Sequence, residues 1–161
     1  MRILTVSDIE DPYLSDHFDR ERWKDIDLVI SCGDIDPDFL DYLVSVLNVP
    51  LLYVKGNHDQ VYSLRPPAGC HNIHGKVIEH RGLRISGLEG AYWYGGQGIE
   101  YSERQMAMKV WWLGLKLRRK GPLDIFVAHA PPRLCANQAG NDPQGVGKPC
   151  ALRKGEQCED A

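Results

Sequence analysis

The most constraining feature of the sequence is a short apolar run that ends in a polar tip, and it recurs along the chain. Residues 3–6, 28–32 and 49–54 are apolar runs of strand length, and each leads into a carboxylate or an Asn-His pair. Helical patterns separate these runs, so the chain reads as repeated βαβ units. Because parallel strands carry their tips to one edge of the sheet, we expect an α/β fold with these side chains close together.

The third tip, residues 56–59, has the richest chemistry. Its sequence is Gly-Asn-His-Asp. The amide oxygen of Asn57 can ligate a hard metal ion, and His58 can move a proton near neutral pH. Asp59 can hold the ring of His58 in one tautomer or contact another group, and we expect both residues to be catalytic. The same tetrad taken alone is equally typical of a turn, and the recurrence of such tips is what favours a functional site.

The first two tips supply carboxylates. Asp8, Glu10 and Asp11 lie within four consecutive positions directly after the first apolar run. Closely placed carboxylates repel one another unless a cation joins them, although a solvated loop is the alternative. Asp34 follows the second run, whereas Asp36 precedes a proline and a helical pattern and is explained as a helix N-cap. The strand-end position therefore favours Asp34 as a functional residue.

Three further histidines differ in their expected roles. His129 directly follows the apolar run 124–128 and precedes two prolines. We expect it to be a metal ligand that joins the other tips, since imidazole is the commonest nitrogen ligand of metals. His71 and His74 have a metal-like spacing, but they lie in a Gly/Pro-rich segment without a neighbouring carboxylate, which favours a structural loop.

The second half of the chain predicts a hairpin and a long helix. Residues 77–79 and 83–88 read as two strands joined by a tight turn. A capping box at Ser102 begins a helix, whose basic C-terminal end suits the helix dipole. Trp111 and Trp112 cannot both face inward, so we expect one of them to be exposed. The predicted inward stripe consists of Met106, Val110, Leu113 and Leu117.

Composition excludes several classes of protein. The chain has 161 residues and a net charge of −3, which gives no support to a nucleic-acid partner. No segment approaches the ~18 continuous apolar residues of a membrane span, so we expect no membrane partner. The N-terminus becomes polar too early for a secretory signal, and the five cysteines are widely spaced and odd in number. These features predict reduced thiols and a cytoplasmic location.

The polar tips together resemble the motifs of the calcineurin-like metallophosphoesterases, in the small bacterial and archaeal branch. That family carries Asp-x-His, Gly-Asp, Gly-Asn-His-Asp/Glu, a lone His and a final Gly-His-x-His. The corresponding residues here are Asp8-Ile9-Glu10, Gly33-Asp34, Gly56-Asn57-His58-Asp59 and His129. The resemblance covers about residues 1–132 and implies a two-sheet sandwich flanked by helices.

The resemblance also implies a reaction, the hydrolysis of a phosphomonoester or phosphodiester by a metal-bridged hydroxide. Asp34 would bridge two divalent ions, Asp8 would bind the first, and Asn57 and His129 would bind the second. His58 would face the phosphate and protonate the leaving oxygen. Carboxylate, amide and imidazole ligands suit Mn²⁺, Fe or Zn²⁺, either as a pair of ions or as a single one.

Two departures from the family pattern shape the expectations. Glu10 replaces a histidine, as a harder and charged ligand, and the final Gly-His-x-His is absent. We therefore expect a C-terminally truncated member in which the second sheet is incomplete, residues 133–161 form an irregular tail, and activity is impaired. The alternative is a non-catalytic, protein-binding scaffold with the same fold. A nucleotide-binding α/β domain is disfavoured, because no Gly-rich phosphate loop follows any strand.

Overall fold

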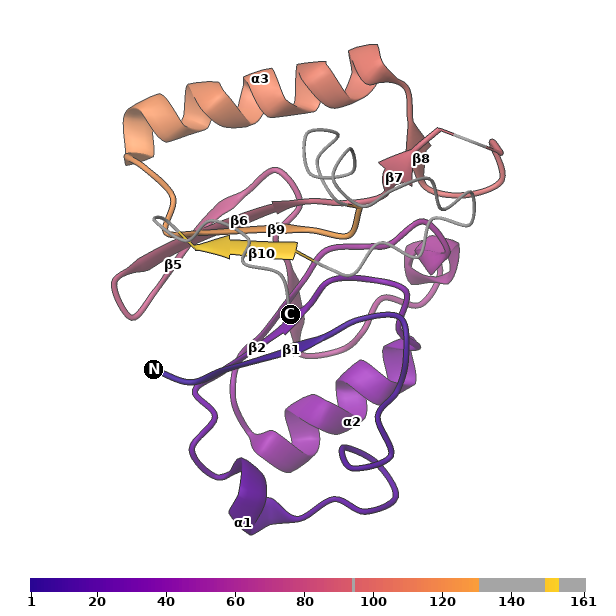
Figure 1. The fold of residues 1–161 in the computed structure, drawn as a ribbon, viewed down its shortest axis with the longest axis vertical. Coiled ribbons are helices and arrows are strands. Elements are labelled where there is room, and N and C mark those ends of the chain that lie inside the picture. Colours follow the sequence, from indigo (N-terminus) through magenta and orange to yellow (C-terminus); the bar gives the residue numbers. More distant parts are fainter. Residues whose placement is uncertain (94, 131–149, 154–161) are drawn as a thin grey trace, which may run out of the picture.

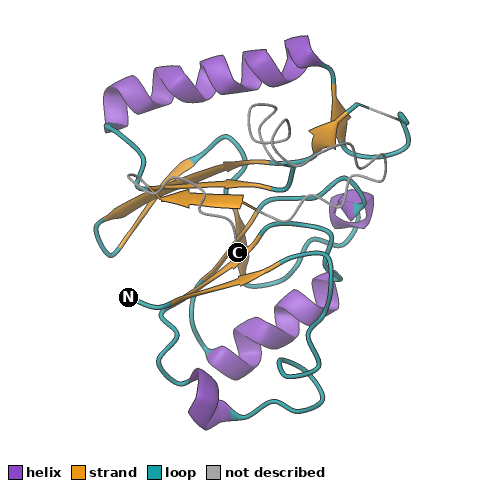
Figure 2. Cartoon of the chain, viewed as in Figure 1, coloured by secondary structure: helices purple, strands orange, loops and turns teal. Residues whose placement is uncertain are grey.

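Two sheets face each other, with helices on the outside of the sandwich (Figure 1, Figure 2). The computed structural model describes residues 1–93, 95–130 and 150–153. The first sheet is parallel and has the order β1-β2-β3-β4, which is also the order of its strands along the chain. These strands are β1 (Ile3–Val6), β2 (Leu28–Ser31), β3 (Leu51–Tyr53) and β4 (Cys70–Asn72).

The second sheet is mixed and has the order β10-β9-β6-β5. Its strands are β5 (Val77–His80), β6 (Leu83–Leu88), β9 (Ile125–Ala128) and β10 (Cys150–Arg153). The predicted hairpin is confirmed as β5 and β6, joined by Arg81 and Gly82, both at positive φ. A small parallel pair, β7 (Ala91–Tyr92) and β8 (Glu100–Tyr101), stands apart from both sheets.

The alternation of side chains along the parallel strands builds two cores. Leu28 and Ile30 of β2 lie in the core between the sheets, whereas Val29 points to the opposite core against α2. On β3, Leu51 packs toward α2 and Leu52 packs between the sheets. Strands buried on both faces read as continuous apolar runs, which is why the sequence pattern located them.

Helix α2 (Pro37–Leu47) covers the outer face of the parallel sheet. It begins as predicted: the Asp36 side chain accepts from the N–H of Asp38, and Pro37 occupies the first turn. Asn48 ends the helix in the left-handed conformation. The polar stretch between β1 and β2 is mostly irregular, and its helical part is α1 (Arg20–Trp23). A 3-10 turn, η1 (Asp59–Ser63), follows the third polar tip.

Helix α3 (Glu103–Lys120) lies outside the mixed sheet, and its predicted capping box at Ser102 is confirmed (Figure 1). The predicted inward stripe is only partly right, because Leu113 is buried but Val110 is 53% exposed. Trp111 and Trp112 are both exposed, more than the sequence suggested. The physical reason is that lysines share the inner face of the helix.

These lysines lie against other parts of the protein. Lys116 Nζ donates to the carbonyl oxygen of Gly75 at 2.6 Å, and Lys120 Nζ donates to that of Val77 at 3.4 Å. Lys109 Nζ lies 3.0 Å from His74 Nε2 and over the ring of Tyr101. The inner face of α3 is therefore partly polar, and several apolar side chains of the helix are exposed to solvent.

The C-terminal segment differs from its expectation in one place. The sequence predicted no strand within the tail 133–161, but Cys150–Arg153 forms β10 and pairs with β9 antiparallel. The sequence signal was weak because these four residues include one large aliphatic residue, Leu152. The rest of the expected tail lies outside the described residues. Among the described residues, no helix has the length and apolarity needed to cross a bilayer.

Candidate metal centre

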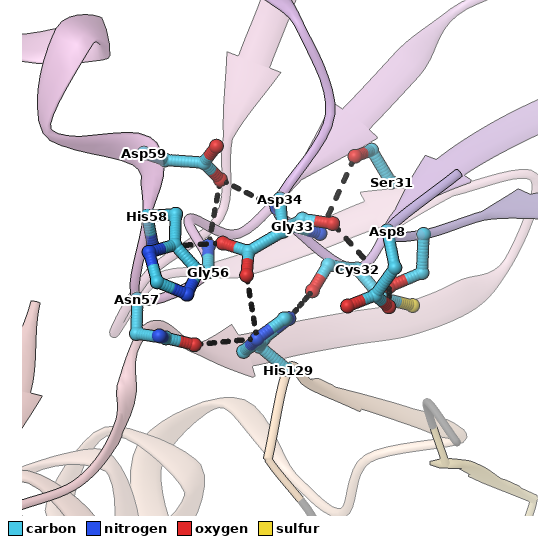
Figure 3. A network of polar contacts seen from close by, with 11 residues as sticks. Asp8, Ser31, Cys32, Gly33, Asp34, Gly56, Asn57, His58, Asp59 and His129 are labelled. Carbon is cyan, nitrogen blue, oxygen red and sulfur yellow. Dashed lines mark hydrogen bonds and ion pairs between the residues drawn. The ribbon is translucent and has the colours of Figure 1, made fainter. Parts of the chain in front are cut away.

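The polar tips of both sheets meet at one point, where β1, β2, β3 and β9 end (Figure 3). Asp8 and Asp34 adopt positive φ angles of 61° and 55°, in the left-handed region that Asp tolerates better than most residues. The N–H of Asp8 donates to the carbonyl oxygen of Gly33 at 3.2 Å. Both residues thus adopt the left-handed conformation directly after a strand, and their carboxylates lie at the same edge of the sheet.

The second and third motifs are in close backbone contact. A Cβ atom on Gly33 would lie 2.2 Å from the backbone nitrogen of Gly56, and Gly33 itself has φ +102°. A Cβ atom on Gly56 would lie 2.0 Å from Oδ1 of Asp34. Only glycine fits at both places, because any side chain would separate the two loops.

Asp59 holds these two loops together. Its Oδ2 accepts from the N–H of Gly56 at 2.7 Å and from the N–H of Asp34 at 2.8 Å. Asp59 is buried, and this burial raises the pKa of its carboxyl group against the opposing effect of the two hydrogen bonds. These contacts make Asp59 a positioning residue, and the catalytic role expected from the sequence stays a prediction.

Replacing Asp59 by Ala should lower the free energy of unfolding by about 1–3 kcal/mol. Two buried N–H groups would lose their acceptor, while the cost of burying a carboxylate would disappear and offset part of that loss. Replacing Asp59 by Asn should cost less than about 1 kcal/mol, since the amide oxygen can accept the same bonds. Urea denaturation of both variants measures the difference. Equal losses of stability in the two variants would contradict the positioning role.

His129 reaches the site from the second sheet with a defined ring orientation. Its Nδ1 lies 2.9 Å from the carbonyl oxygen of Cys32, which can only accept, so Nδ1 carries a proton. Nε2 consequently faces the site, 3.0 Å from Oδ1 of Asn57 and 3.4 Å from Oδ2 of Asp34. Burial lowers the pKa of His129, but the hydrogen bond and charge of Asp34 outweigh it and leave the pKa above its ordinary value.

Asp34 lies at the centre of the arrangement. Its Oδ1 accepts from the backbone N–H of His58 at 2.8 Å, while Oδ2 faces His129. Burial raises the pKa of Asp34, but the hydrogen bonds from His129 and His58 prevail and hold it below its usual value. Asp34 is therefore ionised at neutral pH.

The donor atoms of this cluster fit a divalent cation. One ligand atom from each of Asp8, Asp34 and His129 lies within 4.8 Å of the others, and Asn57 Oδ1 lies beside the imidazole. Two carboxylates, an imidazole nitrogen and an amide oxygen form a mixed O/N set of the kind that binds Mn²⁺, Fe²⁺ or Zn²⁺. Nδ1 of His129 is anchored by a backbone carbonyl, as in most metal-binding histidines.

A comparison with protein families agrees with this geometry. The family model for calcineurin-like phosphoesterases matches residues 1–146. The chain belongs to this family. No curated protein matches the sequence. The resemblance inferred from the motifs and the α/β sandwich expected from it are thus both confirmed. Phosphoesterases of this family typically bind divalent metals, and the cluster described above is the candidate site for them.

The predicted metal ligands of this calcineurin-like phosphoesterase fall into two groups. Asp8, Asp34, Asn57 and His129 converge as expected (Figure 3). Glu10 is exposed and lies outside the described group of clustered ligand atoms, so its predicted role as a ligand remains a prediction.

The two histidines between β3 and β5 lie away from this centre. His74 is half-buried and its Nδ1 accepts from the N–H of Glu89 at 3.0 Å, while His71 is exposed on β4. Burial lowers the pKa of His74, which keeps its ring neutral. These contacts agree with the structural role predicted for the segment.

Sequence reasoning missed two supporting groups of the site. Ser7 Oγ donates to Oδ2 of Asp8 at 2.5 Å, and the backbone carbonyl of Cys32 orients His129. Ser7 could have been suspected, because a hydroxyl directly before a strand-end carboxylate can reach it. The carbonyl of Cys32 has no sequence signal, since every residue carries one.

Proposed function

We propose that this protein is a divalent-metal-dependent phosphoesterase that hydrolyses a phosphomonoester or phosphodiester. The observation that carries the proposal is the convergence of Asp8, Asp34 and His129 at the ends of strands from two sheets. The carboxylates of Asp8 and Asp34 repel each other at this short range unless a cation lies between them. The family match supports phosphoester hydrolysis as the general reaction.

The same residues would hold the metal. Asp8, Asp34, Asn57 and His129 supply the ligand atoms, with Asp34 shared if two ions bind. A bound divalent ion would supply Lewis acidity. It would polarise the phosphoryl group and lower the pKa of water, so that hydroxide is available for the attack. We propose Mn²⁺ as the first metal to test. We also propose a cytoplasmic location, in which the cysteine thiols would stay reduced.

His58 is the proposed general acid. Its backbone N–H is fixed by Oδ1 of Asp34, and its side chain is exposed at the start of η1 (Figure 3). The ring is thus next to the candidate metal ligands and open to a substrate. A histidine there can give a proton to the departing ester oxygen near neutral pH.

The metal dependence is tested first on the wild-type chain. After removal of metal ions with a chelator, the protein should hydrolyse p-nitrophenyl phosphate no faster than buffer does. Added Mn²⁺ should restore hydrolysis. Calorimetric titration with Mn²⁺ measures binding independently of turnover. Absence of Mn²⁺, Fe²⁺ and Zn²⁺ binding would contradict the proposal, and tight metal binding without any turnover would favour the non-catalytic scaffold.

Replacing His58 by Gln should lower kcat roughly 100-fold for an alkyl phosphate, near the lower end for a general acid. The loss should be much smaller for p-nitrophenyl phosphate, because nitrophenolate departs without a proton. His71→Gln is the matched control, since His71 is also an exposed histidine but lies on β4. Equal losses on the two substrates would contradict the role of His58 as an acid.

A further inference from the structure

The outer face of α3 carries a patch of exposed apolar side chains. Met108, Trp111 and Trp112 are 56%, 59% and 56% exposed. Together with the half-buried Leu115, they recur at the three- and four-residue spacing that places side chains on one side of a helix. Trp111 and Trp112 contact each other edge to face, with ring centroids 5.0 Å apart. We call these four residues the α3 patch.

The α3 patch is bordered by positive charge. Arg104 lies seven residues before Trp111, and Arg118 lies seven residues after it, so helical periodicity places both on the outer side. Arg119 is also exposed at the C-terminal end of the patch. These three arginines compare with one acidic residue in the helix, Glu103, although the whole chain has a net charge of −3. The outer face of α3 is thus a basic surface on an acidic protein.

The lysines of α3 do not contribute to this outer surface. As described above, Lys109, Lys116 and Lys120 reach inward to a histidine and two backbone carbonyls. The arginines at the two ends of the patch are what an approaching partner would meet. Symmetric pairing of two α3 helices would bring these arginines together, and like charges oppose such a dimer.

The chemistry of the patch fits a lipid surface. Tryptophan is enriched at the level of lipid headgroups, where its ring is buried and its N–H remains hydrated. Arginines beside it can reach the phosphates of anionic lipids. Helix α3 is the outermost element on its side of the molecule (Figure 1), and its 18 residues give a length of roughly 27 Å. An exposed helix of this kind can lie flat on a bilayer without crossing it.

We propose that the outer face of α3 binds the surface of an anionic lipid bilayer. The sequence predicted no membrane partner because it has no apolar segment long enough to span a bilayer. A helix that lies on the membrane surface does not need such a segment. The indoles of Trp111 and Trp112 enter the headgroup region, and Arg104, Arg118 and Arg119 contact lipid phosphates. This binding does not depend on the proposed hydrolysis, so it can be tested in protein without metal.

The test is co-sedimentation of the full chain with vesicles of phosphatidylcholine containing phosphatidylglycerol, and with vesicles of phosphatidylcholine alone. We expect binding to the anionic vesicles, weakening as salt rises, and a shift of tryptophan emission to shorter wavelength. The double variant Arg118→Gln/Arg119→Gln should bind roughly 30-fold more weakly, at about 1 kcal/mol for each basic residue at the surface. Trp111→Ala/Trp112→Ala should lose binding and the emission shift together.

Matched controls are available elsewhere in the chain. Trp93→Ala removes a tryptophan of similar exposure, 63%, that lies outside α3 and should leave vesicle binding unchanged. Arg20→Gln/Arg22→Gln removes the same charge from α1, at the other end of the molecule (Figure 1), and should also leave it unchanged. Circular dichroism checks that each variant is folded.

Three results would overturn the proposal. They are absence of wild-type binding to anionic vesicles, equal binding to the uncharged vesicles, and an equal loss of binding in the α1 and α3 charge variants. In the first case, binding of an acidic protein by the patch would identify a protein as the partner in place of lipid.

Discussion

Replacement of Asp34 by Asn is expected to weaken divalent-metal binding by more than about 100-fold and to reduce turnover to the buffer rate. Loss of a group that merely orients a metal ligand costs 10–100-fold, and Asp34 is a candidate ligand itself. The variant also removes the charge that faces His129, whose Nε2 lies 3.4 Å from Oδ2. Calorimetric titration with Mn²⁺, together with rates on p-nitrophenyl phosphate, measures both effects.

The control for this experiment is Asp25→Asn. Asp25 is an exposed carboxylate that precedes β2 and pairs with Arg2, so it lies at the opposite edge of the parallel sheet. Its replacement removes the same charge and should leave metal affinity unchanged. Retention of wild-type metal affinity by Asp34→Asn would refute the proposed centre, even if the family assignment stands.

Replacement of Gly33 by Ala is expected to destabilise the protein by about 2–6 kcal/mol. The left-handed φ of +102° is strained for any side chain, and the added methyl group would overlap the backbone of Gly56. Relief of that overlap would move the third motif away from Asp34. Metal affinity should therefore fall together with the free energy of unfolding, as measured by urea denaturation with and without Mn²⁺.

Gly75→Ala separates the two causes of this loss. Gly75 also has a positive φ, +61°, but a Cβ atom there would meet nothing within 4 Å. Its replacement should cost about 1–2 kcal/mol from the left-handed backbone alone, with no loss of metal affinity. If Gly33→Ala proved no more harmful than Gly75→Ala, close contact between the second and third motifs would not matter for the site.

The strand-end motifs were readable from the sequence because they depend on local chemistry. Residues 28–32 are apolar except for Ser31, and Asp34 follows them, so both the buried strand and its polar tip could be located. The capping box at Ser102 and the N-cap at Asp36 were equally local and are confirmed. Such signals need only neighbours in the chain.

The outer face of α3 could not be read in the same way. Val110 fits an inward stripe by spacing, yet it is 53% exposed. The competing residues Lys109 and Lys116 find partners on the loop between β4 and β5, which the spacing of α3 does not reveal. Strand β10 was missed because its four residues include one large aliphatic residue, Leu152, so that no local pattern signals its pairing with β9.

Sequence patterns were sufficient to identify the family and the candidate ligand types at each strand end. Which atoms meet depends on the tertiary structure: Nε2 of His129 faces Asp34 because Nδ1 is held by the carbonyl of Cys32. The tertiary structure also brings the carboxylate of Asp59 to the backbone N–H groups of Gly56 and Asp34, which hold the second and third motifs together. The physical reason is that hydrogen bonds and close packing join residues far apart in the chain, whereas sequence patterns report on the interactions of near neighbours.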